Sequence, residues 1–262
     1  MTKTILITGA TDGLGRATAL ALAKKGHRLI VHGRNAEKLT ALTQSLGVDV
    51  SSIQADMSDL AQVAKMARHL NETQERIDVV INNAGVFKTA EPLTPEGLDV
   101  RFVVNTFAPA LLSGLLLAIV PKDGRLVHLS SAAQAPVDLE AMMGKRRLKD
   151  MDAYAQSKLA LTIWSQDFAE RHGDGPVSVA VNPGSLLATK MVREGFGTAG
   201  NDLNIGVDIL SRVALSDAFA TASGRYFDND SGRFASPHPD AADPGKVAQV
   251  VEAINAPIQS AL

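Results

Sequence analysis

The chain has 262 residues, no cysteine, and 26 basic against 28 acidic side chains, which gives a net charge of −2. This length suits one α/β domain whose core needs no disulfide or metal for stability. The lack of cysteine excludes thiol catalysis and cysteine-based zinc sites, and it fits a reducing compartment. With both signs mixed along the chain, no nucleic-acid surface is indicated.

The apolar segments are too short for export or for a membrane span. Thr4-Ile-Leu-Ile7 is interrupted at once by Gly9, unlike a signal peptide. The longest apolar stretch, Phe107 to Val120, is interrupted by Pro109 and falls short of the about 20 residues that a span needs. We therefore expect a cytoplasmic protein without a membrane partner, in which this stretch forms a buried or interface-forming helix.

Short β-rich apolar runs alternate with helical patterns along the chain. The predicted strands are Thr4–Thr8, Arg28–Val31, Val50–Gln54, Val79–Asn82, Arg125–Leu129 and Val177–Val181. The predicted helices begin near Leu14, Asn35, Asp59, Gly97 and Asp152. Nearly continuous apolar runs are typical of parallel strands that are covered on both faces. The sequence predicts one Rossmann-type α/β domain over residues 1–262, a doubly wound parallel sheet with helices on both faces.

Past Gly184 the pattern weakens into glycine-rich and proline-rich stretches, and we expect a substrate lid over about residues 185–215. In a doubly wound sheet, ligands bind outside the carboxyl ends of the strands, where the strand order reverses. Motifs at the predicted strand ends are therefore the candidates for a functional site.

A glycine-rich turn follows the first strand and leads directly into a helix. In Thr8-Gly-Ala-Thr-Asp-Gly-Leu-Gly15, the glycines permit a tight turn and close approach of the backbone to a pyrophosphate. The helix N-terminus would then offer free N–H groups to the phosphates. The turn is neither the G-x-G-x-x-G fingerprint nor a P-loop, and a purely geometric role is the alternative.

This turn resembles the T-G-x-x-x-G-x-G cofactor motif of the short-chain dehydrogenase/reductase family. The resemblance covers nearly the whole chain and is similar to the retinol-dehydrogenase-like branch, including a C-terminal strand at Gly224-Arg-Tyr-Phe227. The resemblance implies that a nicotinamide cofactor contacts Gly9, Thr11, Asp12, Gly13, Leu14 and Gly15.

The end of the second strand indicates which nicotinamide cofactor is bound. NAD-selective folds place a carboxylate here, whereas an arginine accommodates the 2′-phosphate of NADP. Gly33 stands where the family's Asp is expected, and Arg34 follows it. A guanidinium pairs with a phosphate through two parallel bonds, so we predict NADP(H), with NAD disfavoured. Arg34 capping a surface loop is the alternative, and Asp12 opposes NADP, because many NADP-binding relatives carry a basic or neutral residue there.

Three other strand ends resemble cofactor-contacting segments of the same family. The Asp of Gln54-Ala-Asp-Met57 stands where the family binds adenine, although a strand-end Asp often caps a helix. Asn82-Asn-Ala-Gly85 is identical to the family's N-N-A-G, for which a simple turn is the alternative. Asn182-Pro-Gly184 resembles the P-G…T segment at the nicotinamide, with one extra residue before its threonine. The implied contacts are Asp56, Met57, Asn83, Ala84, Gly85, Pro183, Gly184 and Thr189, together with Tyr154 and Lys158.

Tyr154-Ala-Gln-Ser-Lys158 places a phenol and an ammonium at positions i and i+4, which share one face of a helix. With Asn105 and Ser131 they match, in order, the family's catalytic tetrad, and that role is carried over on the resemblance. Each alone has a structural alternative: a capping asparagine, a strand-end serine or a surface lysine.

The expected chemistry is a proton transfer that accompanies hydride transfer between a carbonyl and an alcohol. A tyrosine pKa near 10 is high for this, and a neighbouring lysine cation would lower it. Tyr154 would then act as general acid in reduction and general base in oxidation. Ser131 would orient the carbonyl oxygen. The family implies that Lys158 holds the nicotinamide ribose and that Asn105 positions a water molecule.

The segment Ala132 to Asp152, with the basic run Lys145-Arg-Arg147, is an insertion of a length similar to that of the retinol-dehydrogenase-like branch. We expect it to border the pocket for a small carbonyl or alcohol substrate, with no metal involved. The apolar helices at 107–120 and 153–169 suggest a homodimer or homotetramer, on their apolarity alone. A catalytically silent NAD(P)-binding sensor or scaffold is the alternative function, and it should have lost the tyrosine or the lysine. The shorter C-terminal part disfavours a sugar-nucleotide epimerase.

Overall fold

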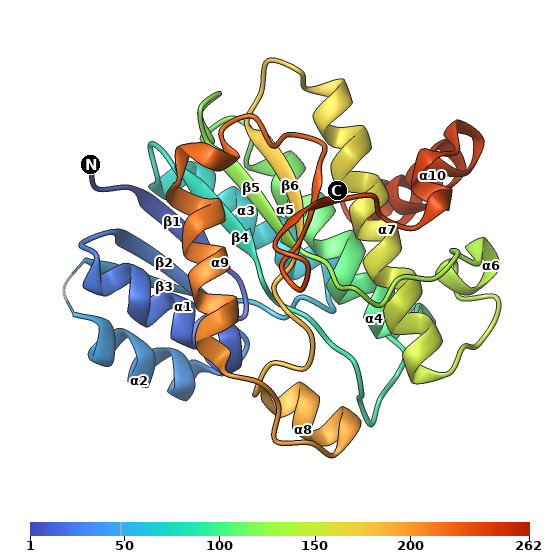
Figure 1. The fold of residues 1–262 in the computed structure, drawn as a ribbon, viewed down its shortest axis with the longest axis horizontal. Helices are drawn as coiled ribbons and strands as arrows, with labels where there is room; N and C mark the ends of the chain where they lie inside the picture. The colour runs from blue at the N-terminus through green and yellow to red at the C-terminus, as the bar shows by residue number, and fades with distance from the viewer. Residues whose placement is uncertain (48) are drawn as a thin grey trace.

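The computed structural model describes residues 1–47 and 49–262, and an eight-stranded sheet forms its centre (Figure 1). The strand order is β3-β2-β1-β4-β5-β6-β7-β8. The strands are β1 Thr4–Ile7, β2 Arg28–Gly33, β3 Val50–Gln54, β4 Val79–Asn82, β5 Arg125–Leu129, β6 Val177–Asn182, β7 Tyr226–Asp228 and β8 Arg233–Ala235. Only β8 runs antiparallel to its neighbour among these strands. The predicted doubly wound parallel sheet is confirmed, and strand order reverses between β1 and β4.

Helices cover both faces of the sheet (Figure 1). They are α1 Gly13–Lys24, α2 Ala36–Leu46, α3 Leu60–Thr73, α4 Val100–Phe102, α5 Ala108–Leu115, α6 Leu139–Met142, α7 Asp150–Arg171, α8 Lys190–Phe196, α9 Leu203–Leu215 and α10 Pro244–Ser260. A π-helix, η1, spans Val103–Phe107, and two 3₁₀ turns are η2 Asp217–Phe219 and η3 Pro239–Ala242. One face carries α1, α2 and α9, and the other carries α3, α5, α7 and α10.

Side chains of the first strand divide between the two core layers. Leu6 packs in the layer of α3, α5 and α7, whereas Ile5 and Ile7 pack in the layer of α1, α2 and α9. All three are fully buried. Successive side chains of a strand point to opposite faces, so a strand covered on both sides is apolar throughout.

Carboxylate and amide side chains set where the helices begin. Asn35 accepts a hydrogen bond from the Lys38 amide, and Asp59 accepts from the Ala61 amide, so α2 and α3 start where the sequence predicted. The helix expected near Gly97 starts at Val100 instead, because Asp99 is its N-cap. Its cap bond comes from the Arg101 amide, at 2.9 Å.

Helix α7, whose apolar surface suggested contact with a second subunit, is covered by another helix of the same chain. Helix α10 packs along α7, and its Val250, Val251 and Ile254 join the core of that face. The apolarity of α7 is thus accounted for without a second subunit, and the oligomeric state stays a prediction.

Within the range expected as a lid, α9 packs against α1 in the opposite core, which leaves α8 and its flanking loops at the surface. Among the described residues, no helix is long and apolar enough to cross a bilayer.

Candidate active site

The carboxyl ends of β1 and β4 are tied together at the point where strand order reverses. The Asn83 side-chain amide donates to the carbonyls of Thr8 and Gly9, at 2.8 and 3.1 Å. The Ala84 amide donates to the Thr8 hydroxyl at 3.0 Å. Asn83 therefore fastens the N-N-A-G segment to the glycine turn, as expected for a shared site.

The glycine turn packs too closely for side chains at two positions. A Cβ on Gly9, whose φ is +64°, would lie 2.8 Å from Cα of Ala84. A Cβ on Gly15 would lie 2.3 Å from the Gly9 carbonyl oxygen. At the end of β2, a Cβ on Gly33 would lie 2.5 Å from a methyl carbon of Thr11. Thr11 thus occupies the space of the acidic side chain that NAD-selective folds carry there.

The N-terminus of α1 leaves amide groups available to a phosphate. Asp12 caps the helix and accepts from the Gly13 amide at 2.7 Å. The amides of Leu14 and Gly15 have no acceptor among residues 1–47 and 49–262. Unpaired amides at a helix N-terminus are a ready site for an anion. The Asp12 carboxylate lies 3.6 Å from the Lys38 ammonium in an exposed pair, which offsets its negative charge.

The ends of β2 and β3 place Arg34 and Asp56 as the sequence suggested. Arg34 is exposed, and its guanidinium makes no ion pair or hydrogen bond with the described residues. Asp59, not Asp56, is the N-cap of α3. Asp56 instead accepts from the amide and hydroxyl of Ser58, at 2.9 and 2.7 Å, through one oxygen, while Met57 is buried. The helix-cap alternative for Asp56 is therefore set aside.

Asn105 lies in the π-helix η1 and connects three segments. Its side-chain oxygen Oδ1 accepts from the Val86 backbone amide at 2.8 Å, and its side-chain NH₂ group donates to the Val86 backbone carbonyl at 3.0 Å. The same amide group donates to the Ser157 hydroxyl at 2.9 Å. Single-turn π-helices occur often at functional sites. The side chain binds protein groups here, so the expected role in positioning water stays a prediction.

Tyr154 and Lys158 face one another on α7, beside Ser131 at the end of β5. The Lys158 ammonium lies 5.5 Å from the Tyr154 ring centre and donates to the Leu129 carbonyl at 2.7 Å. The Ser131 hydroxyl is close enough to the Tyr154 phenol to favour the phenolate and so to lower its pKa. A Cβ on Gly85 would lie 3.4 Å from Oδ1 of Asn105 and 3.6 Å from the ammonium. The structure thus brings all four candidate catalytic residues together.

Burial dominates the acid–base properties of this pair. It raises the pKa of Tyr154, and the nearby Ser131 hydroxyl opposes that rise. The sequence had predicted a lowered Tyr154 pKa, which is wrong, because removing the phenolate from water outweighs its stabilisation. Burial also lowers the pKa of Lys158 to about 8, although the side chain remains largely protonated at pH 7.

The loop after β6 lies beside the glycine turn. A Cβ on Gly13 would lie 3.5 Å from the Thr189 methyl carbon, and the Pro183 carbonyl accepts from the Asn229 amide at 3.0 Å. Gly184 adopts a φ of +128°, which favours glycine. Thr189 is the N-cap of α8, since its hydroxyl accepts from the Val192 amide at 3.2 Å. The two predicted ends of the nucleotide site are therefore adjacent.

The profile of the family described as short chain dehydrogenase matches residues 3–198. The chain belongs to this family. Over 92% of its length it is 29% identical to human "Retinol dehydrogenase 13", of which the alignment covers 80%. It is 33% identical to a "Putative daunorubicin C-13 ketoreductase DnrU" from Streptomyces sp. (strain C5), with 96% of this chain and 91% of that protein covered.

A solved short-chain dehydrogenase from Shigella flexneri, described as complexed with NADP, has a similar fold. Its TM-score is 0.69 at 26% identity, with 87% of this chain and 97% of that chain covered. The chain is thus a short-chain dehydrogenase/reductase enzyme with a Rossmann fold, similar to the retinol-dehydrogenase-like branch, as the sequence motifs predicted.

The insertion of this short-chain dehydrogenase is anchored to α7, the helix that carries Tyr154. Gln156 on α7 accepts from the Asp138 amide at 2.9 Å, and Asp138 in turn caps the short helix α6. Arg146, from the basic run, pairs with the Asp138 carboxylate at 2.7 Å. These contacts hold the middle of the insertion against α7, and its role as a pocket border stays a proposal.

Two residues that the sequence analysis passed over support the site. His32 accepts from the Gly9 amide at 3.2 Å, and its other ring nitrogen contacts the Ala55 carbonyl at 3.0 Å. Burial lowers its pKa, so the ring is neutral and carries its proton on Nε2. Ser157 donates to the Tyr154 carbonyl at 2.7 Å while accepting from Asn105. A histidine within an apolar strand was a visible signal, whereas a helical serine was not.

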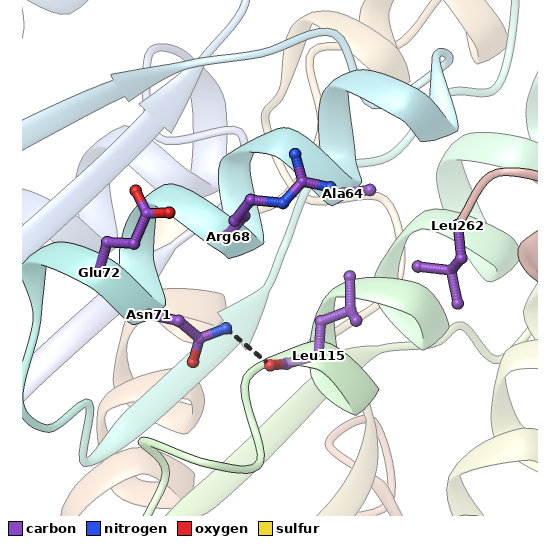
Figure 2. Close-up of a pocket in the computed structure, with 6 residues that line it drawn as sticks. All are labelled: Ala64, Arg68, Asn71, Glu72, Leu115 and Leu262. Atoms are coloured by element: carbon purple, nitrogen blue, oxygen red, sulfur yellow. Dashed lines mark hydrogen bonds between the residues drawn. The ribbon is translucent and has the colours of Figure 1, made fainter.

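A cavity of about 270 Å³ lies away from these residues, between α3, α5 and the chain end (Figure 2). Its lining includes Arg68, Asn71 and Leu115, and the Asn71 amide donates to the Leu115 carbonyl at 2.9 Å. None of the candidate site residues lines this cavity. The candidate site is therefore defined by its side chains and not by this cavity.

Proposed function

We propose that this enzyme is an NADP-dependent oxidoreductase that interconverts a carbonyl and an alcohol, with Tyr154 as general acid/base. The observation that supports this function most directly is the cluster of four side chains beside the glycine turn, Ser131, Tyr154, Lys158 and Asn105. Bound NADP(H) would supply or accept the hydride. A cytoplasmic location, expected from the sequence, belongs to the same proposal.

The residues around the glycine turn fit the phosphates of such a cofactor. The unpaired amides of Leu14 and Gly15 would bind the pyrophosphate, as at other helix N-termini. The unpaired guanidinium of Arg34 would bind the 2′-phosphate, which a hydroxyl could not replace. The remaining contacts proposed for the cofactor are Gly9, Thr11, Asp12, Gly13, Asp56, Met57, Asn83, Ala84, Gly85, Tyr154, Lys158, Pro183, Gly184 and Thr189.

The protein side of the chemistry is a proton held at the Tyr154 hydroxyl. Burial raises the pKa of Tyr154, so the phenol carries its proton at neutral pH and can donate it to an alkoxide during reduction. Ser131, close to the same phenol, would donate to the substrate oxygen and orient it. The Lys158 ammonium favours the phenolate that remains, and its proximity would help Tyr154 act as base in oxidation.

The exposed part of the predicted lid is α8 with its flanking loops, and we propose that it closes over the substrate. A Cβ on Gly195 of α8 would lie 2.5 Å from the ring of Phe87. Phe87 in turn packs edge-on against Tyr154, with ring centres 5.3 Å apart. The lid thus touches the side of the site where the carbonyl would lie.

Titration of NADPH and NADH by fluorescence, on wild type and Arg34→Ala, tests the cofactor assignment. Charge-assisted hydrogen bonds contribute about 1.5–3 kcal/mol, so Arg34→Ala should weaken NADPH binding roughly 10- to 150-fold. NADH affinity should stay unchanged. Arg68→Ala, an exposed arginine at the distant cavity, is the matched control. Equal affinity of wild type for both nucleotides would refute NADP selectivity, and binding of neither would refute the proposed function.

The names of the relatives suggest where a substrate screen should begin. Retinal and polycyclic aromatic ketones are the carbonyl compounds closest to "retinol dehydrogenase" and "daunorubicin C-13 ketoreductase". The alternative, a silent NAD(P)-binding sensor or scaffold, predicts nucleotide binding without turnover of any carbonyl in such a screen. The retained Tyr154 and Lys158 favour the enzyme.

A further inference from the structure

The turn between β7 and β8 is hydrogen-bonded to the loop that follows β6. The Asn182 side-chain amide donates to the carboxylates of Asp228 and Asp230, at 2.8 and 2.9 Å. Asn182 also pairs with Asp228 in the register of β6 and β7. A hairpin at the far edge of the sheet therefore reaches the loop proposed for the nicotinamide end of the cofactor.

Asp230 makes the largest share of these contacts. One of its oxygens accepts from the Ser185 amide at 2.8 Å, and the other accepts from the Ser185 hydroxyl and the Asn182 amide. Next to it, Asn229 donates to the Pro183 carbonyl at 3.0 Å. Three donors on two oxygens require a carboxylate, since a side-chain amide would turn an NH₂ group toward one of them.

Farther along this loop, Leu186 and Ala188 exchange backbone hydrogen bonds with Asn201, at 2.7 and 2.8 Å, so the contacts of Asp230 matter most for residues 183–185. Pro183 has no N–H to donate, and Gly184 at a φ of +128° lies outside the sheet. Leu186 adopts a φ of +51°, the only positive φ of a non-glycine residue in the described part of the chain. A residue in this region persists only where its surroundings hold it in place.

The other end of the same hairpin reaches the proposed catalytic serine. The Tyr226 phenol on β7 donates to the Ser131 carbonyl at 3.0 Å. The Gln134 side chain donates to this carbonyl as well, and its oxygen accepts from the His238 amide just past β8, both at 3.0 Å. Tyr226 is 5% exposed, and burial beside Asp228 and Asp230 raises its pKa, so the phenol stays a donor.

We propose that the β7–β8 hairpin positions the active site at two points, with Asp230 holding loop 182–185 for the nucleotide and Tyr226 holding Ser131 for the substrate. Both are positioning residues, because neither side chain is placed to touch the reacting atoms. The inference rests on the proposed function of the site. It assigns separable effects to the two residues: Asp230 acts on nucleotide affinity, and Tyr226 acts on turnover.

The test compares Asp230→Asn, Tyr226→Phe and the control Ser231→Ala, which removes a hydroxyl of the same turn that binds Asp228 and not Asp230. NADPH affinity is measured by fluorescence, and turnover is measured with isatin as the carbonyl probe. Asp230→Asn should weaken NADPH binding about tenfold, because the freed loop must be ordered on binding. Tyr226→Phe should keep wild-type NADPH affinity and lower kcat about tenfold, because the Ser131 carbonyl loses one of the two side-chain donors that orient this residue.

Hydrogen exchange of the Gly184 and Ser185 amides, without nucleotide, separates this inference from the proposed function. Asp230→Asn should speed their exchange, whereas Tyr226→Phe and Ser231→Ala should leave it unchanged. Unchanged exchange in Asp230→Asn would overturn the clamp even if wild type binds NADPH. Faster exchange would support the clamp even if wild type bound no nucleotide, which would refute only the proposed function. Equal losses of affinity and thermal stability in all three variants would show a purely structural hairpin.

Discussion

Replacing Arg101 by methionine should destabilise the fold far more than the loss of an exposed ion pair does. The side chain is 1% exposed, and its guanidinium binds both oxygens of Asp99 at 2.9 and 2.7 Å. It also binds Asp150 at the start of α7 and donates to the Phe87 carbonyl at 3.4 Å. Arg101 thus connects α4, the segment after N-N-A-G and the helix of Tyr154.

The expected cost follows from the charge that the substitution leaves behind. Asp99 is 7% exposed, and removing the partner of a buried ion typically costs about 3–5 kcal/mol. The matched control is Arg212→Met, which removes an exposed pair to Asp208 at 3.9 Å on α9. Such a pair contributes about 0.3–0.5 kcal/mol.

Urea unfolding, followed through the fluorescence of the single tryptophan, Trp164, measures both variants. The double variant Asp99→Asn/Arg101→Met should be more stable than Arg101→Met, since asparagine keeps the helix cap and removes the unpaired charge. A loss below about 1 kcal/mol for Arg101→Met, the usual ceiling for exposed pairs, would refute the reasoning.

Two other predictions concern single protons. Burial lowers the pKa of His128 to about 3, well below its unfolded value near 6.5, so the unfolded chain binds this proton first as the pH falls. The neutral ring contributes fully to the free energy of unfolding above pH 6.5, and this contribution is lost as the pH falls toward 3. The loss is roughly 2 kcal/mol between pH 6.5 and 5. In urea titrations at several pH values, His128→Asn should flatten this dependence of stability on pH. Tyr154→Phe should lower isatin reduction by about 10²- to 10⁴-fold while NADPH affinity stays within about twofold. If Tyr154→Phe keeps its turnover, another group must donate the proton to the substrate. If His128→Asn keeps the wild-type dependence of stability on pH, other side chains must cause that dependence.

Local patterns predicted strands β1 to β6 and the candidate site residues, whereas the short antiparallel strand β8 was not predicted. Each motif follows a buried apolar strand, and the carboxyl ends of parallel strands meet at one edge of the sheet. Asn83 therefore meets the glycine turn, and Tyr154 and Lys158 face one another, at this edge of the sheet. Local signals also set most helix starts, and the misplaced start near Gly97 came from overlooking Asp99 as a cap.

Features that depend on distant pairings could not be predicted. Arg101 meets Asp150 across 49 positions of the chain, and Tyr226 meets Ser131 across 95. No local pattern encodes either partner. The Tyr154 pKa failed for a related reason: spacing places Lys158 nearby, but the extent of burial, which dominates the shift, is a property of the folded surroundings.

The cover that α10 provides over α7 has a consequence for how the protein responds to dilution. A surface covered by a second chain becomes exposed when the concentration falls below the dissociation constant. A tethered helix keeps a fixed effective concentration, whatever the amount of protein in solution. This face of α7 should therefore stay covered even in nanomolar enzyme assays. An extension fused after Leu262 would expose it only if the extension loosened α10.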